Sequence, residues 1–338
     1  MEVLKTYLWF RRLALIAAVL ALCLVVLGAY VRLSDAGLGC PDWPGCYGSL
    51  SVPESQSAIV HAQSAFPDKP VVAHKAWKEM IHRYVAGTLG LLVIGLFLLG
   101  WRAKRYIAVS PWLPSALVLV IGFQAMLGMW TVTLLLKPVI VSLHLIGGMT
   151  TLALLTWIAH RHFGTFIGRG SEMQSLRWFV RGALLVIFAQ IFLGGWTSSN
   201  YAALACTDFP TCHGQWMPSM DFASAFHLTR ELGQSATGEP LGLSAFVAIQ
   251  WTHRLGALIT SAYFLILSVL LISNPRLKSF GLILLGLLTL QVSLGIANLL
   301  LHLPLVLAVG HNMGAALLLM TIVVINSKIT LLTKGSYL

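Results

Sequence analysis

The sequence predicts an all-α integral membrane protein with eight transmembrane helices, arranged as two four-helix bundles that are parallel repeats. Three observations predict this fold class. The 338-residue chain is 57% hydrophobic and only 10% charged, whereas a soluble domain carries about 25% charged residues. Eight apolar stretches are long enough to cross a bilayer, which takes about 20 helical residues. The two halves of the chain also share landmarks in the same order.

The eight apolar stretches are the predicted spans. Helices are expected because backbone groups in hydrocarbon must be satisfied within the segment. The first stretch follows three basic residues, as a signal peptide would, but its apolar part is too long and no small-residue cleavage site follows. We therefore expect it to belong to the fold. The spans are residues 13–31, 77–100, 112–134, 139–159, 178–197, 246–272, 279–301 and 304–326.

The distribution of charge predicts the orientation in the membrane. Nine of the eleven acidic residues fall on the side opposite to a set of basic residues, so the positive-inside rule places the basic side and both termini in the cytoplasm. We expect a multi-pass protein of the cell inner (plasma) membrane, and interpret the net charge of +11 as a topology signal with no nucleic-acid partner. The basic set is Lys5, Arg11, Arg12, Arg102, Lys104, Arg105, Arg161, Arg169, Arg177, Arg181, Arg276, Lys278, Lys328 and Lys334.

Two long segments, 32–76 and 198–245, are then external, and each carries a cysteine pair. The pairs are Cys40 with Cys46 and Cys206 with Cys212, both with C-x5-C spacing. This spacing is neither C-x-x-C nor that of a zinc site. An oxidising compartment favours a disulfide in each segment. A structural staple and a redox-active pair both remain open.

Four landmarks recur in the second half at nearly one offset. LGAYVRLSDAGLGCPDWPGC from Leu27 matches LGGWTSSNYAALACTDFPTC from Leu193, an offset of 166. FQAMLGMW matches LQVSLGIA at an offset of 167, as His144 matches His311. His82-Arg83 matches His253-Arg254 at an offset of 171, so the extra residues fall in the second external segment. Such self-similarity is typical of a duplicated structural unit.

The halves are residues 1–168 and 169–338, joined by the polar stretch at about 160–177. Each contains four spans, an even number, so the copies share one orientation and are related by an axis along the membrane normal. We expect no soluble domain.

Four of the eleven histidines are duplicated by the repeat: His82, His144, His253 and His311. An ionisable residue within a span is costly and usually functional. His82 and His144 each lie five or six residues inside spans that enter from outside, about 8–9 Å below the external boundary. Two imidazoles at one depth in a four-helix bundle are suited to hold a haem iron. Hydrogen bonding between helices, or a zinc or copper site, are the alternatives.

The spans contain two further repeated pairs of polar residues, one of arginines and one of glutamines. Arg83 and Arg254 follow the first histidine of each half, and could bind haem propionates or act as interfacial anchors. Gln124 and Gln291 are expected to join helices.

The symmetry of the two halves breaks at Glu79. Glu79 lies three residues before His82 and therefore on the same helix face, whereas the corresponding residue before His253 is Gln250. A carboxylate there could relay protons or stabilise developing positive charge, or could form a surface ion pair with Arg83. The asymmetry favours chemistry in the first half and a permanent redox haem in the second.

The motifs together resemble the haem A synthase family over the whole chain. The resemblance rests on VRLSDAGLGCPDWPGC, the ExxHR of Glu79–Arg83, HLxGG from His144, THRLGA around His253 and GHNMGAA around His311. It implies oxidation of the C8 methyl group of haem O to a formyl group, giving haem A for cytochrome c oxidase.

The same resemblance implies roles for individual residues. His82 and His144 would flank the substrate haem in residues 1–168, with Glu79 as a catalytic carboxylate. His253 and His311 would ligate a haem b in residues 169–338. The external cysteines would form disulfides near the first site. The implied partners are a haem O synthase that supplies the substrate and an electron donor, in a membrane lipid setting; a homo-oligomer stays open.

Two other functions compete with this interpretation. A transmembrane cytochrome b electron carrier would need a haem near each face to cross about 30 Å of hydrocarbon, whereas all four histidines are predicted near the external face. A haem transporter would place its site at the midplane beside broken helices, whereas the prolines here lie mostly at helix ends or in loops.

Overall fold

The computed structural model describes residues 2–104, 110–163 and 173–334. In these ranges, eight helices are long and apolar enough to cross a membrane, which confirms the predicted spans. Arg105, Arg169 and the predicted boundary between residues 168 and 169 lie outside the described ranges. The long helices are α1 (Glu2–Leu33), α3 (Ala73–Ala103), α4 (Trp112–Thr133), α5 (Pro138–Phe163), α6 (Met173–Ser199), α8 (Leu243–Ile272), α9 (Lys278–Leu300) and α10 (Leu305–Lys334).

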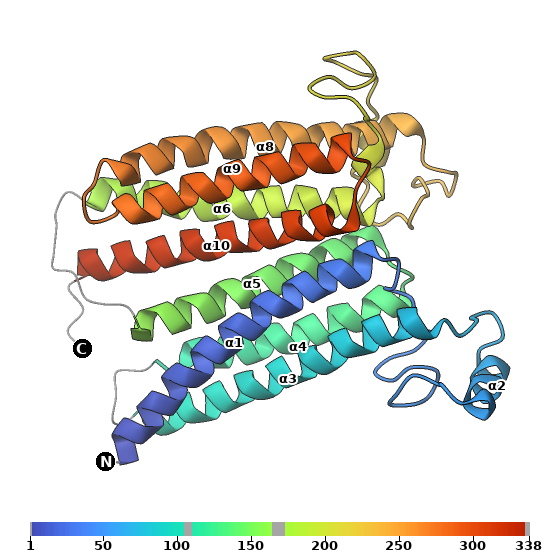
Figure 1. Cartoon of the computed structure of the whole chain (residues 1–338), viewed down its shortest axis with the longest axis horizontal. Coiled ribbons are helices and arrows are strands. Elements are labelled where there is room, and N and C mark those ends of the chain that lie inside the picture. The colour runs from blue at the N-terminus through green and yellow to red at the C-terminus, as the bar shows by residue number, and fades with distance from the viewer. Residues whose placement is uncertain (1, 105–109, 164–172, 335–338) are drawn as a thin grey trace.

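The helices gather into two groups that follow the chain order (Figure 1). One contains α1, α3, α4 and α5, and the other contains α6, α8, α9 and α10. The groups meet where α5 packs on α6 and α10, and where α1 packs on α10. This is the all-helical fold class that the sequence predicts; its description as two parallel repeats stays a prediction.

Three hydrogen bonds agree with an axis between the halves, because each joins residues one repeat apart. Arg32 donates to the carbonyl of Ser198 at 3.0 Å, and the hydroxyl of Tyr201 lies 3.4 Å from the Asp35 carboxylate, both at an offset of 166. His160 and Ser327 are 3.0 Å apart at an offset of 167. A residue that contacts its own counterpart must lie beside the axis that relates the copies.

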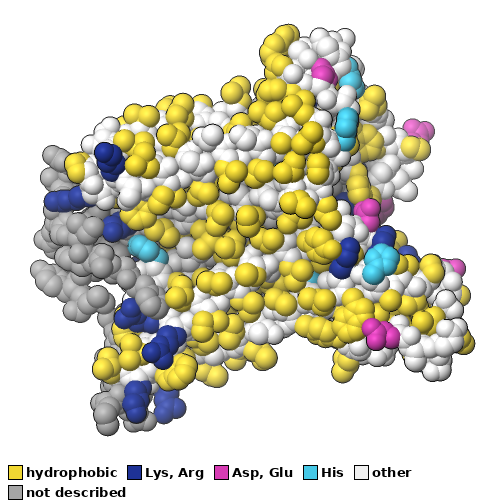
Figure 2. Space-filling view, viewed as in Figure 1, with side chains coloured by type: hydrophobic (Ala, Val, Ile, Leu, Met, Phe, Trp, Pro, Cys, Tyr) yellow, Lys and Arg dark blue, Asp and Glu magenta, His cyan; other side chains and the backbone are white. Residues whose placement is uncertain are grey.

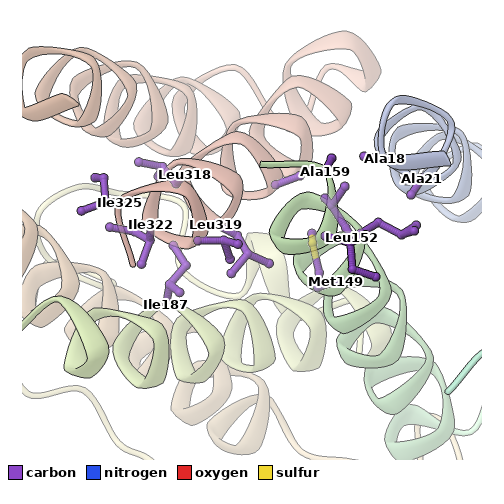
Figure 3. Packing of buried hydrophobic residues seen from close by; sticks show 14 of the residues in the cluster. Ala18, Ala21, Met149, Leu152, Ala159, Ile187, Leu318, Leu319, Ile322 and Ile325 are labelled. Carbon is purple, nitrogen blue, oxygen red and sulfur yellow. The ribbon is translucent and has the colours of Figure 1, made fainter. Parts of the chain in front are cut away.

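The main buried cluster fills the junction between the groups. Figure 3 shows Met149 and Leu152 of α5 close to Ala18 and Ala21 of α1, with Ile187 of α6 and the leucines and isoleucines of α10 beside them. Alanines on α1 let the helix backbones approach closely, as is usual where helices pack in lipid.

The molecular surface divides into three zones along the helices (Figure 2). Most of the visible Lys and Arg lie at the end where α1 begins and α10 ends, whereas Asp and Glu, with a few further Lys and Arg, lie at the opposite end, and apolar side chains lie between the two ends. Large apolar side chains are exposed on this band, such as Leu91, Leu119 and Leu185. An exposed apolar band of this kind fits a lipid surround.

The acidic end carries two long segments with short helices that the sequence did not predict: α2 (Gln56–Ala65), the 3₁₀ helix η1 (Ala202–Leu204) and α7 (Phe222–Ala225). The side chain of Ser55 accepts from the N–H of Ala58 and caps α2, and Asp221 caps α7 through Ser224. The predicted disulfides Cys40–Cys46 and Cys206–Cys212 are both present.

Candidate functional site

The four repeated histidines line one cavity of about 2650 Å³. His144 and His311 each lie six residues after the first residue of α5 and α10, whereas His82 and His253 lie nine and ten residues after the first residues of α3 and α8. Helices α3 and α8 begin earlier than predicted, so His82 and His253 lie further from the helix ends than the sequence indicated. The predicted set is nevertheless brought together.

The cavity is mainly apolar and is continuous across the two halves. Its volume is well above the 300–1,000 Å³ of a site for a drug-sized ligand. It therefore has room for more than one large planar ligand. The external segment of each half forms a disulfide-bonded hairpin, residues 40–49 in the first half and 206–215 in the second. These two hairpins close one end of the cavity, because Trp43 and Pro44 line it in the first half and Phe209 and Pro210 line it in the second.

Each histidine ring packs against a glycine of a neighbouring helix. A Cβ on Gly28 or Gly295 would lie 3.0 Å from Cε1 of His82 or His311. A Cβ on Gly128 or Gly194 would lie 3.3 or 3.2 Å from Cε1 of His144 or His253. These gaps are too short for a comfortable side-chain contact, so the four glycines provide the space in which the rings lie.

Three glutamines contact three of the histidines. The Gln124 amide donates to the backbone carbonyl of His144 at 2.5 Å. The Gln190 amide nitrogen lies 3.1 Å from Nδ1 of His253 and 3.2 Å from its carbonyl, and that of Gln291 lies 3.3 Å from Nε2 of His311. Gln124 and Gln291 thus join helices as predicted, and in addition they hold histidine residues.

The rings retain free nitrogen atoms inside the cavity. Nδ1 of His82, His144 and His311 is buried without a hydrogen-bond partner among the described residues. A buried polar atom without a partner is costly unless a ligand or another group completes it. Paired imidazoles with unpartnered nitrogens in a large apolar cavity therefore fit a haem in each half.

Glu79 connects α3 to the first external hairpin. Its side chain is only 5% exposed. One carboxylate oxygen accepts from the backbone N–H of Cys40 at 3.0 Å, and the other forms an ion pair with Arg83 at 2.5 Å. The carboxylate thus lies between the disulfide and His82, three residues along the same helix.

Gln250 makes the corresponding connection in the second half. Its side-chain oxygen accepts from the N–H of Cys206 at 2.5 Å, and its amide nitrogen donates to the carbonyl of Ala203 at 2.5 Å. The predicted asymmetry therefore concerns charge and not anchoring, since both side chains hold the first cysteine of their hairpin.

Arg83 and Arg254 donate to carbonyls of the hairpins. Arg83 reaches Asp42 at 2.9 Å and also the carbonyls of Pro44 and Gly45. Arg254 reaches Thr211 at 2.7 Å and Cys206 at 3.1 Å. These contacts hold each hairpin over the cavity. Binding of propionates by the two arginines stays a prediction.

An aspartate closes each hairpin turn, and sequence reasoning missed both. Asp42 accepts from the N–H groups of Tyr47 and Gly48 at 2.7 and 2.8 Å. Asp208 accepts from those of His213 and Gly214 at 2.6 and 3.0 Å, and from the Thr211 hydroxyl. The Thr211 hydroxyl and these backbone N–H groups hold the pKa of Asp208 below its usual range.

Comparison with known proteins places this architecture in a family. The sequence profile of the COX15-CtaA family, described as a cytochrome oxidase assembly protein, matches residues 11–323. The chain belongs to this family. A curated relative named "Heme A synthase" from Shewanella oneidensis is 47% identical over 319 residues, which cover 94% of this chain and 95% of the relative.

More distant members carry the same name. "Heme A synthase" of Caulobacter vibrioides is 28% identical over 90% of this chain and 91% of its own length. That of Halalkalibacterium halodurans is 28% identical over 67% of this chain and 70% of its own length.

In this COX15-CtaA member, the residues that sequence reasoning missed are mostly uncharged. Gln190 lies within a predicted span, and Gly28 and Gly194 lie at matched positions of the repeat. The available signal was the offset itself, because Gly28 and Gly194 are 166 residues apart. Asp42 and Asp208 share that offset, inside the two matched hairpin runs.

Proposed function

We propose that this chain is a haem A synthase, which oxidises the C8 methyl group of haem O to a formyl group. The observation that carries the proposal is the 47% identity with a "Heme A synthase" over nearly the full length of both chains. The cavity with two matched histidine pairs supports it, because the substrate and a redox cofactor need two separate haem sites.

The first half, residues 1–168, is proposed as the catalytic half, with His82 and His144 on either side of the substrate haem. The bound haem iron would supply the oxidation chemistry. Glu79 would hold a proton near the reacting edge, since its carboxylate is buried and lies on the same helix three residues before His82. The hairpin held by Arg83 would exclude water from this end of the cavity.

The second half, residues 169–338, is proposed to hold a haem b between His253 and His311 that passes electrons to the first. Gln250 in place of a carboxylate supports a role without proton transfer. Arg83 and Arg254 are proposed to bind propionates from the positions where they hold the hairpins.

The setting of the reaction is proposed from charge and chemistry. The basic end would face the cytoplasm with both termini, and the histidines would lie towards the periplasmic side of the cell inner membrane. A haem O synthase would supply the substrate through the lipid. Conversion of a methyl to a formyl group removes four electrons and adds an oxygen atom, so the reaction would also take an oxidant of the dioxygen class. The electron donor would deliver, through the second half, the electrons that reduce the remaining oxygen of that oxidant to water. The farnesyl-type tail of haem O partitions into lipid, so lateral entry needs no aqueous path.

The test is the haem content of the purified protein when a haem O synthase is co-expressed. Haem would be extracted with acid acetone and separated by reverse-phase chromatography with mass detection. Haem B together with haem O, haem A or an oxidised intermediate supports the proposal. Haem B alone at two per chain would favour an electron carrier, and absence of haem would favour a transporter; either result contradicts the proposal.

A further inference from the structure

Three of the four histidines share one local arrangement. A neighbouring helix carries Gln-x-x-x-Gly, in which the glycine lies against the imidazole ring. The glutamine contacts the ring at His253 and His311, and the backbone carbonyl at His144. The histidine helix carries His-x-x-Gly. We call this arrangement a glutamine clamp. The clamps are Gln124 and Gly128 with His144 and Gly147, Gln190 and Gly194 with His253 and Gly256, and Gln291 and Gly295 with His311 and Gly314.

The glycine after each clamped histidine is required by space. The side-chain oxygen of Gln124 lies so close to Gly147 that an added Cβ would be nearer than 3.0 Å. The same holds for Gln190 at Gly256 and for Gln291 at Gly314. Any larger residue at these positions would displace the glutamine.

His82 has no clamp. Gly28 lies against its ring as in the other three sites, but the residue one turn before Gly28 is Leu24, at the position where Gln190 stands in the second half. The residue three after His82 is Val85, whereas each clamped histidine has glycine at this position.

We propose that His82 is the exchangeable histidine of the first half, while His144, His253 and His311 are fixed by glutamine clamps. This inference rests on the proposed function in so far as the bound group is a haem. A group that orients a ligating histidine fixes its ring, and loss of such a group weakens ligation by about 10- to 100-fold. His82 would therefore yield to a small ligand at the first-half site, whereas His253 and His311 would both stay in place at the second-half site.

The clamp residues are positioning residues, so the test reads ligand exchange directly. Carbon monoxide would be titrated into the reduced full-length protein that holds both haems, and followed by its absorption spectrum. Wild-type protein should bind about one carbon monoxide per two haems, because only one haem would be held by an exchangeable histidine.

Reciprocal exchange of the clamp residues makes the test specific. Leu24→Gln with Val85→Gly adds a clamp to the first half, and should weaken carbon monoxide binding at least about tenfold with haem content retained. Gln190→Leu with Gly256→Val removes the clamp from His253, and should raise binding towards about two per two haems. Val19→Gln, on the exposed face of the same helix as Leu24 and outside the cavity lining, is the control for a new amide and should leave carbon monoxide binding unchanged.

Equal binding of carbon monoxide by both haems of the wild-type protein, or by neither, would overturn the inference. So would unchanged binding in a Leu24→Gln, Val85→Gly protein that retains both haems. If that variant does not accumulate, the Gln190→Leu single variant decides, since it must increase binding at the second haem. These readouts do not depend on haem A formation, so failure of the proposed function would be seen separately in the wild-type conversion assay.

Discussion

Replacement of Glu79 by glutamine separates the two tasks that the structure assigns to this side chain. Glu79 accepts from the N–H of Cys40 and forms an ion pair with Arg83. A glutamine can keep the first contact, because Gln250 holds the N–H of Cys206 in the same way. It removes the negative charge and turns one oxygen, a hydrogen-bond acceptor, into a donor.

The expected loss of stability is moderate. A hydrogen bond to a charged group contributes about 1.5–3 kcal/mol. Arg83 retains carbonyl partners in the hairpin, Asp42 among them, so its guanidinium is not left without acceptors. We therefore expect the free energy of unfolding to fall by no more than about 3 kcal/mol, with both haems still bound.

The expected loss of activity is much larger. A positioned acid–base group contributes about 10²- to 10⁴-fold to a rate, so Glu79→Gln should form haem A at no more than about a hundredth of the wild-type rate. The assay is the yield of haem A from haem O per bound haem, with thermal unfolding measured on the same sample. Gln250→Glu is the matched control in the second half, and should not increase haem A formation. Normal product yield from Glu79→Gln would refute the role of the carboxylate.

Two further predictions concern Gly28, which lies against the His82 ring, and Asp208, which closes the second hairpin. Gly28→Ala should displace the His82 ring, because the new Cβ would lie 3.0 Å from Cε1. Overpacking of this kind costs about 1–3 kcal/mol, so the ratio of haem to protein in the purified variant should fall. An unchanged ratio would contradict the packing argument. Asp208 has a lowered pKa in the folded protein, so its contribution to hairpin stability is complete above its unfolded pKa of about 3.9 and is lost as the pH falls further. The protection factors of the N–H groups of His213 and Gly214, which are the exchange rates corrected for the intrinsic pH dependence of amide exchange, should fall on acidification in the wild type and should be low at every pH in Asp208→Ala.

The sequence predicted the spans well because lipid imposes a simple rule on composition. Their ends were less accurate, since helices continue beyond the hydrocarbon, where composition no longer constrains them. Helix α3 begins at Ala73 and not at residue 77, and α8 begins at Leu243 and not at residue 246. The short helix α2 was missed because neither apolar periodicity nor length marks it.

The histidine set was predictable for a different reason. Ionisable residues are rare in spans, and duplication at one offset separated His82, His144, His253 and His311 from the other histidines. Glycines and glutamines are common enough in membrane helices that no single one is informative. Gln190 became meaningful only when the structure placed it against His253 and Gly256.

Two departures from the repeat lie on one face of α3. Glu79, His82 and Val85 follow each other at three-residue intervals, and the first and third differ in kind from Gln250 and Gly256 in the second half. Anchoring of the hairpin does not explain Glu79, since Gln250 provides it without charge. Packing does not explain Val85, since three other sites keep glycine there. The two differences place an acid and an unclamped histidine side by side in one half of the cavity, whereas the other half keeps a neutral amide and two clamped rings. Under the proposed function a redox cofactor would need fixed ligands and no proton exchange, and the substrate would need the opposite, so we infer that this helix face distinguishes the two sites.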